Sequence, residues 1–280
     1  MNIDINVVRD LIKMQFPEWS HLEITPVKNS GHDNRTFHLG EQLAIRMPSA
    51  KEYEAQVEKE AKWLPKIAAQ LSYPITCPVA KGKPSKEYPY HWSVNRWIDG
   101  ETLTKKNLDQ NQLAIDLASF LIELQTTNPT NGPVPGKHNF YRGGNLSVYN
   151  DETIKALDKL DTAVISEKCI QIWKQALNTS WERKPVWIHG DLAPGNIIIQ
   201  NNHLSGVIDF GCMGVGDPAC DYVIAWTFFS HQSRKIFKEQ LHVDEKTWNR
   251  AKGWALWKAL ITYDDPVSQK VVQILTSEIT

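Results

Sequence analysis

The sequence predicts an α+β protein of two lobes, with a small sheet-containing lobe over residues 1–97 and a mainly helical lobe over residues 98–280. Three observations support this prediction. The chain has 280 residues, which is close to the upper limit of ~250–300 residues for one hydrophobic core. Short β-rich runs separated by turn residues dominate the first part. Apolar residues at helical spacing dominate the second part.

The first lobe is expected to combine strands with two helices. Val7, Val8, Leu11 and Ile12 are predicted to share one face of an N-terminal helix. A second helix is predicted over residues 50–71, where Pro65 is expected to kink or split it. Strands are predicted over residues 22–27, 36–39, 43–47 and 92–98. The turn residues Gly40-Glu41 between two of these strands indicate a hairpin.

The second lobe shows several helix starts. Asp109 precedes a strongly periodic helix, Asp217-Pro218 begins a helix that is expected to reach Phe229, and Asp244 precedes another. Two more helices are predicted near residues 151–161 and 166–181, and Pro266 begins the last one. Residues 129–149 are rich in Pro, Gly and Asn and predict a long loop.

Residues 187–221 carry the residue types that point to chemistry. The apolar runs 197–199 and 204–208, separated by Asn201-Asn202, predict a β-hairpin. This hairpin would bring Asn196 and Asp209 within about one residue pair of each other, on strands ~4.8 Å apart. Two oxygen ligands at such a separation suit one hard divalent cation. Asp191 precedes the hairpin and can act beside that ion.

One candidate base and two metal ligands meet the needs of metal-assisted phosphoryl transfer. His189-Gly190-Asp191, then Asn196, then Asp209-Phe210-Gly211 resembles the protein-kinase catalytic loop and Asp-Phe-Gly pair, with Gly190 in place of Arg. With the following Gly-Asp-Pro-x-x-Asp, the pattern resembles the aminoglycoside phosphotransferase family. That family includes macrolide, choline and fructosamine kinases and shares the protein-kinase-like fold.

The resemblance implies a small-molecule kinase that transfers the γ-phosphoryl of ATP or GTP to an acceptor hydroxyl. Asp191 would orient or deprotonate that hydroxyl, and Asn196 and Asp209 would hold Mg²⁺. Arg46 stands where kinases carry the strand lysine, and its planar guanidinium can hold phosphate oxygens. Glu60 would pair with Arg46 by the family pattern Lys-Glu-x-x-Trp-Leu, although Glu54 and Glu58 lie on the same predicted helix.

Two further segments are expected to contact the nucleotide. Gly31 permits close backbone approach to an anion, within a loop that resembles the family's Ser-Gly-x-x-Asn sequence. The backbone from Arg96 to Ile98 resembles the linker that binds the adenine edge, and such backbone contacts do not separate ATP from GTP. The loop residues assigned to the phosphates are Ser30, Gly31, His32 and Asn34.

The composition limits which binding partners and which cellular location are expected. The chain holds 31 basic and 32 acidic residues, which gives no electrostatic argument for nucleic acid or an anionic membrane. No apolar run approaches the ~18 residues of a membrane span, and the N-terminal segment does not resemble a signal peptide. The four cysteines are scattered without metal or redox spacing. A cytoplasmic protein is expected, and the sequence leaves its oligomeric state open.

Two other functions are compatible with parts of the sequence. A non-catalytic nucleotide-binding protein would use the same segments without turnover. A metal-dependent hydrolase would use His189, Asp191, His203 and Asp209, but it would need a further His/Asp cluster, and neither H-x-H nor H-E-x-x-H occurs. A protein kinase is less expected, because His-Arg-Asp and a following Ala-Pro-Glu segment are missing from the sequence.

The sequence does not name the acceptor. Residues 186–280 carry ten acidic and eight basic residues, and Asp264-Asp265 is the main candidate for binding an ammonium group. Several tryptophans in the same region favour an apolar or flat acceptor if they line the cleft. A small hydroxylated molecule with few positive charges is therefore expected. In the loop 129–149, Arg142, His138 and Tyr141 are candidates for substrate contact, with a plain surface loop as the alternative.

Overall fold

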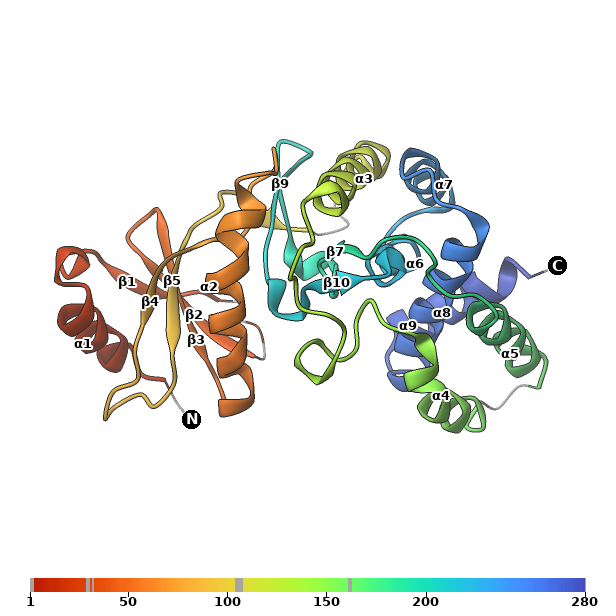
Figure 1. Ribbon diagram of the computed structural model, residues 1–280, viewed down its shortest axis with the longest axis horizontal. Helices are drawn as coiled ribbons and strands as arrows, with labels where there is room; N and C mark the ends of the chain where they lie inside the picture. Colours follow the sequence, from red (N-terminus) through yellow and green to blue (C-terminus); the bar gives the residue numbers. More distant parts are fainter. Residues whose placement is uncertain (1–2, 29–30, 32, 104–107, 161–162, 280) are drawn as a thin grey trace. The chain divides into compact units, whose positions relative to one another are not determined.

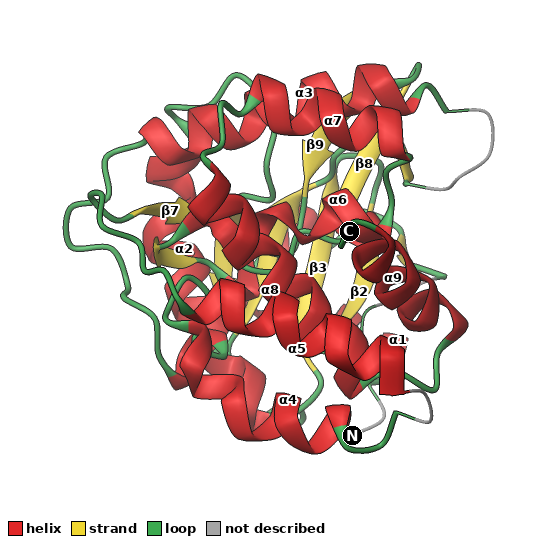
Figure 2. Cartoon of the chain, turned by 90° about the vertical axis from the view of Figure 1, so that its right-hand side faces the viewer, coloured by secondary structure: helices red, strands yellow, loops and turns green. Residues whose placement is uncertain are grey.

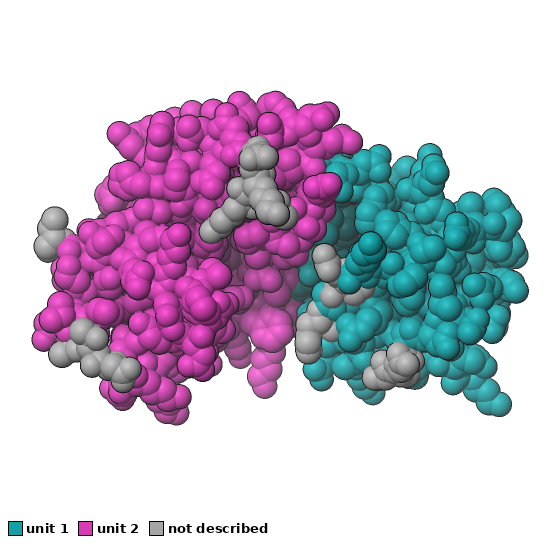
Figure 3. Space-filling view, turned by 180° about the vertical axis from the view of Figure 1, so that it is seen from behind, with its two compact units in different colours: residues 1–100, 205–211 teal, residues 101–204, 212–280 magenta. Residues whose placement is uncertain are grey.

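The structure is a computed structural model that describes residues 3–28, 31, 33–103, 108–160 and 163–279. The chain forms two compact units, which are coloured separately in Figure 3. The first comprises Met1–Gly100 and Ser205–Gly211, and the second comprises Glu101–Leu204 and Cys212–Thr280. The short segment that contains Asp209 therefore belongs to the first unit, although it follows Asp191 in the sequence.

The first unit is built on an antiparallel sheet with the strand order β1-β2-β3-β5-β4 (Figure 1). Its elements are α1 (Ile5–Gln15), β1 (Ile24–Pro26), β2 (Asn34–Leu39), β3 (Leu43–Pro48), α2 (Glu54–Ala68), β4 (Pro78–Gly82) and β5 (Trp92–Arg96). The strand β3 is central, because Arg46 lies opposite Thr36 of β2 and Ser93 of β5. Arg46, the predicted phosphate-binding cation, therefore lies on the central strand of the sheet, between β2 and β5.

The core of the first unit lies between α1 and the sheet. Val8, Leu11 and Ile12 of α1 are buried together with Ile45 of β3 and Trp92 of β5. Burial of a large apolar side chain stabilises a fold by roughly 1.5–3 kcal/mol, so this cluster holds the sheet in place. The predicted amphipathic face of the N-terminal helix is thus confirmed.

The helix α2 differs from its prediction at Pro65. The segment starts with a 3-10 turn, Lys51–Tyr53, and then continues as one helix through Pro65 to Ala68. Because Pro65 lies in the last turn, its missing N–H removes one hydrogen bond near the helix end and does not split the helix. Glu60 is therefore carried on an unbroken helix.

The second unit is mainly helical and is organised around α8. This helix packs against α4, α5, α9 and the 3-10 segment Pro218–Val223, and Figure 2 shows α8 beside α5. The helices are α3 (Gln110–Thr126), α4 (Asn150–Leu157), α5 (Ala163–Leu177), α6 (Ile224–Thr227), α7 (His231–Gln240), α8 (Glu245–Ile261) and α9 (Pro266–Ser277). The mixed α+β class expected from the sequence is confirmed.

Short strands frame the segment that carries Asp191. The strand β7 (Val186–Ile188) pairs with β10 (Gly214–Gly216), and Trp187 lies opposite Val215. The other sheet has the order β6-β8-β9, formed by β6 (Glu101–Thr102), β8 (Ile197–Gln200) and β9 (His203–Val207). Asn201 and Asn202 make the turn between β8 and β9 with positive φ, as expected for turn asparagines. Residues 189–196 therefore run between β7 and β8.

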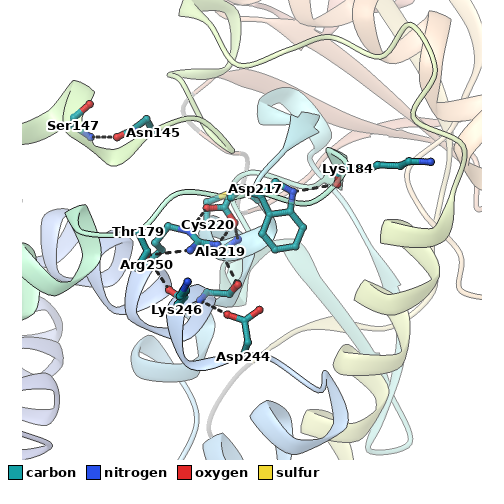
Figure 4. Close-up of polar contacts among 12 residues, drawn as sticks. Asn145, Ser147, Thr179, Lys184, Asp217, Ala219, Cys220, Asp244, Lys246 and Arg250 are labelled. Atoms are coloured by element: carbon teal, nitrogen blue, oxygen red, sulfur yellow. Dashed lines mark hydrogen bonds and ion pairs between the residues drawn. The ribbon is translucent and has the colours of Figure 1, made fainter.

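The helix predicted from Asp217 to Phe229 is two elements in the structure. A 3-10 segment, Pro218–Val223, precedes α6, which ends at Thr227. Asp217 caps the 3-10 segment by accepting a hydrogen bond from the Ala219 N–H. Its carboxylate also binds the Arg250 guanidinium of α8, at 2.6 Å from Nε, and Figure 4 shows this contact. Asp217 therefore fixes this segment to α8.

Across the ranges that the structure describes, no helix combines the length and the apolar composition needed to cross a membrane.

Candidate active site

The segment that carries Asp191 is held by a buried carboxylate. Asp221 is fully buried, and its two oxygens accept the backbone N–H groups of His189 at 2.8 Å and Gly190 at 2.7 Å. The Asp191 N–H in turn donates to His189 Nδ1 at 3.2 Å. Burial raises the pKa of Asp221, while His189 and the two N–H donors act in the opposite direction. Asp221 thus braces the loop that carries Asp191.

Gly190 meets a steric requirement of the same loop. Its φ is +86°, and a Cβ atom there would lie 2.3 Å from the carbonyl oxygen of Cys212. A side chain at this position would therefore force the backbone apart. This explains why glycine stands where the protein-kinase motif carries arginine.

The side-chain oxygen atoms of Asp191 and Asn196 remain available to accept a proton or to bind a metal ion. The Asp191 side chain is 42% exposed and lies 3.5 Å from the Lys258 ammonium. Asn196 belongs to a 3-10 turn, Pro194–Asn196, and its Nδ2 donates to the Asp191 carbonyl at 2.9 Å. Because the amide nitrogen of Asn196 takes part in this hydrogen bond, the amide oxygen is the atom that can serve as a metal ligand. Such an oxygen is a suitable ligand for a hard cation.

Arg46 is the centre of a partly buried charge network in the first unit. Its Nη1 lies 3.2 Å from Glu60, and its Nη2 lies 2.8 Å from Asp209. The other two candidate glutamates have different partners, because Glu54 binds His91 and Glu58 binds Lys81. The structure therefore selects Glu60, which was the preferred partner in the sequence.

The charges of this network depend on one another. Burial lowers the pKa of Arg46, but the Glu60 and Asp209 carboxylates more than offset this effect, so the pKa is raised overall. Burial also raises the pKa of Glu60, and Arg46 acts against it. Asp209 has a φ of +65°, and Lys59 Nζ donates to the adjacent Gly211 carbonyl at 2.6 Å. Lys59 of α2 therefore holds the Gly211 end of the Asp209-Phe210-Gly211 sequence, and Arg46 of β3 holds the Asp209 end.

Of the loop residues that are predicted to contact the phosphates, the structure describes Gly31 and Asn34. Ser30 and His32 lie outside the described residues. Gly31 is exposed, and no atom in the described chain lies within 4 Å of the position of a Cβ atom there. Asn34 is the first residue of β2 and is buried, opposite Pro48. It therefore lies at the strand end of the predicted loop.

The predicted adenine-binding segment follows the end of β5. The Arg96 N–H donates to the Cys77 carbonyl at 3.2 Å, so that group is already used. Ile98 packs close to Gly206, where a Cβ atom would lie 2.9 Å from Ile98 Cγ2. In the described part of the chain, the Ile98 backbone N–H and C=O have no hydrogen-bond partner. The backbone groups of Ile98 are therefore available, as the prediction of an adenine-binding segment requires.

Comparison with known proteins decides the family. Residues 23–254 match the phosphotransferase enzyme family, and this range covers most of the chain. The chain belongs to this phosphotransferase family. Its members transfer a phosphoryl group to a hydroxyl group, so this chain is a phosphotransferase.

Solved structures agree in fold. Aminoglycoside 2'-phosphotransferase-IIIa in complex with GDP is 17% identical, with a TM-score of 0.77, and the match covers 99% of this chain and 100% of that chain. Macrolide 2'-phosphotransferase from Brachybacterium faecium, an apoenzyme, is 14% identical, with a TM-score of 0.67 and 99% coverage of both chains. The APH(2'')-IIa complex with streptomycin and ATP is 22% identical, with a TM-score of 0.62 and coverage of 99% and 97%. At these identities the likeness establishes a kinase-like fold.

The second unit of the phosphotransferase contains a pocket of about 160 Å³ next to Asp191. Residues from the catalytic loop, the 3-10 segment after Asp217, α6, α8 and the loop 129–149 line it. They are Arg142, Gly190, Asp191, Leu192, Ala193, Pro194, Cys220, Val223, Thr227, Trp254, Trp257 and Lys258. Because the candidate base lies in its wall, this pocket is the candidate acceptor site.

Sequence reasoning missed Lys258. Trp254, Trp257 and Lys258 have the spacing i, i+3 and i+4, which places them on one face of α8. That spacing was visible in the sequence, but it could not show that the face lies against Asp191. Trp254 and Trp257 are 1% and 5% exposed and therefore belong to the core, and both also line the pocket.

Two other candidates have structural roles in this phosphotransferase. Asp265 caps α9 by accepting the Val267 N–H at 2.9 Å, so the Asp264-Asp265 pair lies at an exposed helix start and is not part of the pocket lining. His203 lies 3.0 Å from the Asp116 carboxylate, and His189 is fully buried. The described residues contain no group of three or more His, Cys, Asp or Glu side chains arranged to hold a metal ion. Of the two histidines of the hydrolase alternative, His189 is thus enclosed in the protein and His203 is paired with Asp116.

Proposed function

We propose that this phosphotransferase transfers the γ-phosphoryl group of ATP or GTP to a hydroxyl group of a small molecule. Family membership supports phosphoryl transfer to an alcohol. Relatives of similar fold in complexes with GDP and with ATP support a nucleoside triphosphate as the donor. The proposal assigns nucleotide binding to the first unit and acceptor binding to the second.

The contact of Arg46 with both Glu60 and Asp209 carries this proposal. Kinase-like enzymes need a cation for the nucleotide phosphates, a glutamate that orients it and an aspartate that binds metal. Arg46 meets Glu60 at 3.2 Å and Asp209 at 2.8 Å, so the candidates for all three roles are joined within one unit. A surface arginine on a strand would be largely exposed, whereas the Arg46 side chain is 12% exposed and contacts two carboxylates.

The remaining roles are assigned to residues of the second unit together with Asp209 of the first. Asp191 is exposed in the wall of the pocket, where it can accept the proton of an acceptor hydroxyl or orient it. The amide oxygen of Asn196 and the carboxylate of Asp209 are the ligand types that Mg²⁺ takes. When bound, this ion neutralises charge on the transferred phosphoryl group. Asp221 holds the loop in place during the reaction.

The acceptor is proposed to be a small molecule with few positive charges. The pocket volume of about 160 Å³ lies below the ~300–1,000 Å³ range of typical ligand pockets. Its lining contains Trp254 and Trp257, and Asp191 is the single carboxylate among the described lining residues. An aminoglycoside with several ammonium groups would find few counter-charges there.

Nucleotide binding with and without Mg²⁺ tests the first part of the proposal. Asp209→Ala should abolish the Mg²⁺-dependent gain in nucleotide affinity, because it removes a carboxylate ligand, and Asn196→Ala should weaken that gain. Asp10→Ala, a change at an exposed position of α1, is the matched control and should bind as the wild type does. Equal nucleotide affinities for the wild type and Asp209→Ala in Mg²⁺ would contradict the metal role.

A further inference from the structure

Arg142 is a buried cation in the wall of the candidate acceptor pocket. Asn139 holds its backbone from two sides, since Asn139 Nδ2 donates to the Arg142 carbonyl and the Arg142 N–H donates to the Asn139 carbonyl. The residue is 8% exposed, and its guanidinium carbon lies 5.3 Å from the ring centre of Trp254 and 4.8 Å from that of Trp257. The loop and the two indoles therefore fix the position of the guanidinium.

This guanidinium is without a counter-charge. In the ranges that the structure describes, no carboxylate and no hydrogen-bond acceptor contacts its five N–H donors. The guanidinium nitrogens are not among the fully enclosed side-chain atoms of the described chain that lack a hydrogen-bond partner, so they are open to solvent, and Arg142 lines the pocket. The two indoles attract the charge through their faces and leave its N–H donors to water or to a ligand. The side chain is thus positioned for an anion that enters the pocket.

A second cation lies in the same pocket. Lys258 Nζ is 3.5 Å from the Asp191 carboxylate, and the lysine side chain is 48% exposed. Nearby carboxylates already have partners, because Glu152 accepts the Trp257 indole N–H at 2.7 Å and Asp221 accepts two backbone N–H groups. The described lining therefore contains two cations and one carboxylate, and the carboxylate is the proposed base.

We propose that the acceptor carries an acidic group, a carboxylate or a phosphate, which binds Arg142 and Lys258 while its hydroxyl group faces Asp191. A guanidinium can bind either anion through two parallel hydrogen bonds, so both share the chemistry recognised here. Trp254 and Trp257 would contact the body of the molecule. This inference rests on the proposed function and deepens it, because it names the acceptor class of the same pocket.

One competing role for these cations makes a different kinetic prediction. A lysine beside the catalytic aspartate can instead hold the transferred phosphoryl group. In that case Lys258→Gln would lower kcat or raise the KM for the nucleotide, and the KM for the acceptor would stay unchanged. An acceptor-binding role predicts the reverse split, with a raised KM for the acceptor and an unchanged KM for the nucleotide.

The test uses acceptors in matched pairs that differ in one acidic group. Glycerate with glycerol, gluconate with sorbitol, and shikimate with its methyl ester test the carboxylate. Glucose 6-phosphate with glucose tests the phosphate, and kanamycin and choline represent cationic acceptors. Each compound is measured for nucleotide turnover with Mg²⁺-ATP and, separately, for binding to the nucleotide-free protein by isothermal titration calorimetry.

The variants are Arg142→Gln, Lys258→Gln and a matched control, Arg183→Gln. Arg183 also lies over an indole, with its guanidinium carbon 5.6 Å from the ring centre of Trp181, but it is exposed, pairs with Asp244 and lies outside the pocket lining. Arg142→Gln should weaken binding of the preferred acid by about 30-fold or more, as expected for the loss of one partner of a buried charge pair. Because the Lys258 side chain is 48% exposed, the Lys258→Gln variant should fold as the wild type does. It should raise the KM of the same acid several-fold.

The outcomes separate this inference from the proposed function. Acids that bind and react at least about tenfold better than their neutral partners, with loss in both pocket variants and none in Arg183→Gln, support both. Acids that bind in this pattern without phosphoryl transfer support the anion site and contradict the proposed function. Cationic or neutral compounds as the best acceptors, or no acid that binds better than its neutral partner, overturn the inference.

Discussion

At the scale of single residues, two unusual backbone positions define the site. Asp209 adopts a φ of +65° and Gly190 a φ of +86°. Residues other than glycine, asparagine and aspartate seldom adopt a positive φ. Asp209 is held by Arg46, and Gly190 is held by the Asp221 carboxylate. Glycine adopts this conformation without strain, whereas Asp209 is disfavoured there and is held by its contacts, as is common at functional sites.

The first prediction concerns Gly190→Ala. The new Cβ would lie 2.3 Å from the Cys212 carbonyl oxygen at a positive φ, so we expect a loss of stability of at least ~1–3 kcal/mol and a displaced catalytic loop. Gly195→Ala is the control in the same loop, because no described atom lies within 4 Å of its Cβ position. Urea denaturation and turnover measure both variants. Equal stability of the two variants would contradict the steric explanation.

Residue identity alone could predict much of this site. The types and spacing of Asp191, Asn196 and Asp209 led to a phosphotransferase, and the family pattern led to the correct glutamate for Arg46. Arg142 was only one of three loop candidates, because the indoles that hold it follow more than a hundred residues later. A contact over that distance in sequence leaves no periodicity to recognise.

At the scale of elements, α8 connects the acceptor pocket to the segment after Asp217. One end of α8 carries the buried Arg250, whose Nε lies 2.6 Å from the Asp217 carboxylate (Figure 4). Further along the helix, Trp254, Trp257 and Lys258 face the pocket. Burial raises the pKa of Asp217, and the hydrogen-bonded Arg250 opposes that effect. The ion pair therefore fixes the helix relative to the loop that Asp221 braces.

The second prediction tests this connection with Asp217→Asn. The side chains of Asp217 and Arg250 are each 6% exposed, so the variant leaves a buried guanidinium without its counter-charge. We expect a loss of ~3–5 kcal/mol in the free energy of unfolding, measured by urea denaturation. Arg183→Gln breaks an exposed pair with Asp244, whose side chains are 68% and 39% exposed, and should change stability little. Similar small losses in both variants would show that the buried pair does not hold α8.

Helix starts were predicted well, and helix types less well. Asp109 and Asp244 each cap the predicted helix through a side-chain oxygen, and the last helix begins at Pro266 as expected. The segment after Asp217 was expected to be one α-helix, but it begins as a 3-10 helix. Asp221 in that segment binds the backbone of residues 189 and 190, and local propensity cannot anticipate such a tertiary contact.

At the scale of the whole molecule, the chain distributes the proposed machinery over two units. The first contains Arg46, Glu60 and Asp209, and the second contains Asp191, Asn196 and the acceptor pocket. The sequence predicted two lobes from its patterns, but it did not predict that residues 205–211 join the first unit. Lys59 and Arg46 explain this assignment, because they bind Gly211 and Asp209 in that segment.

The central claim is that Asp191 acts on the acceptor hydroxyl and does not bind the nucleotide. The most direct measurement compares Asp191→Asn with the wild type for Mg²⁺-dependent nucleotide binding and for turnover of the best acceptor. We predict unchanged nucleotide affinity and a turnover lower by ~10²–10⁴-fold, because the variant keeps the shape of the side chain and loses its basicity. Near-wild-type turnover by Asp191→Asn, or a loss of nucleotide binding equal to the loss of turnover, would contradict the account.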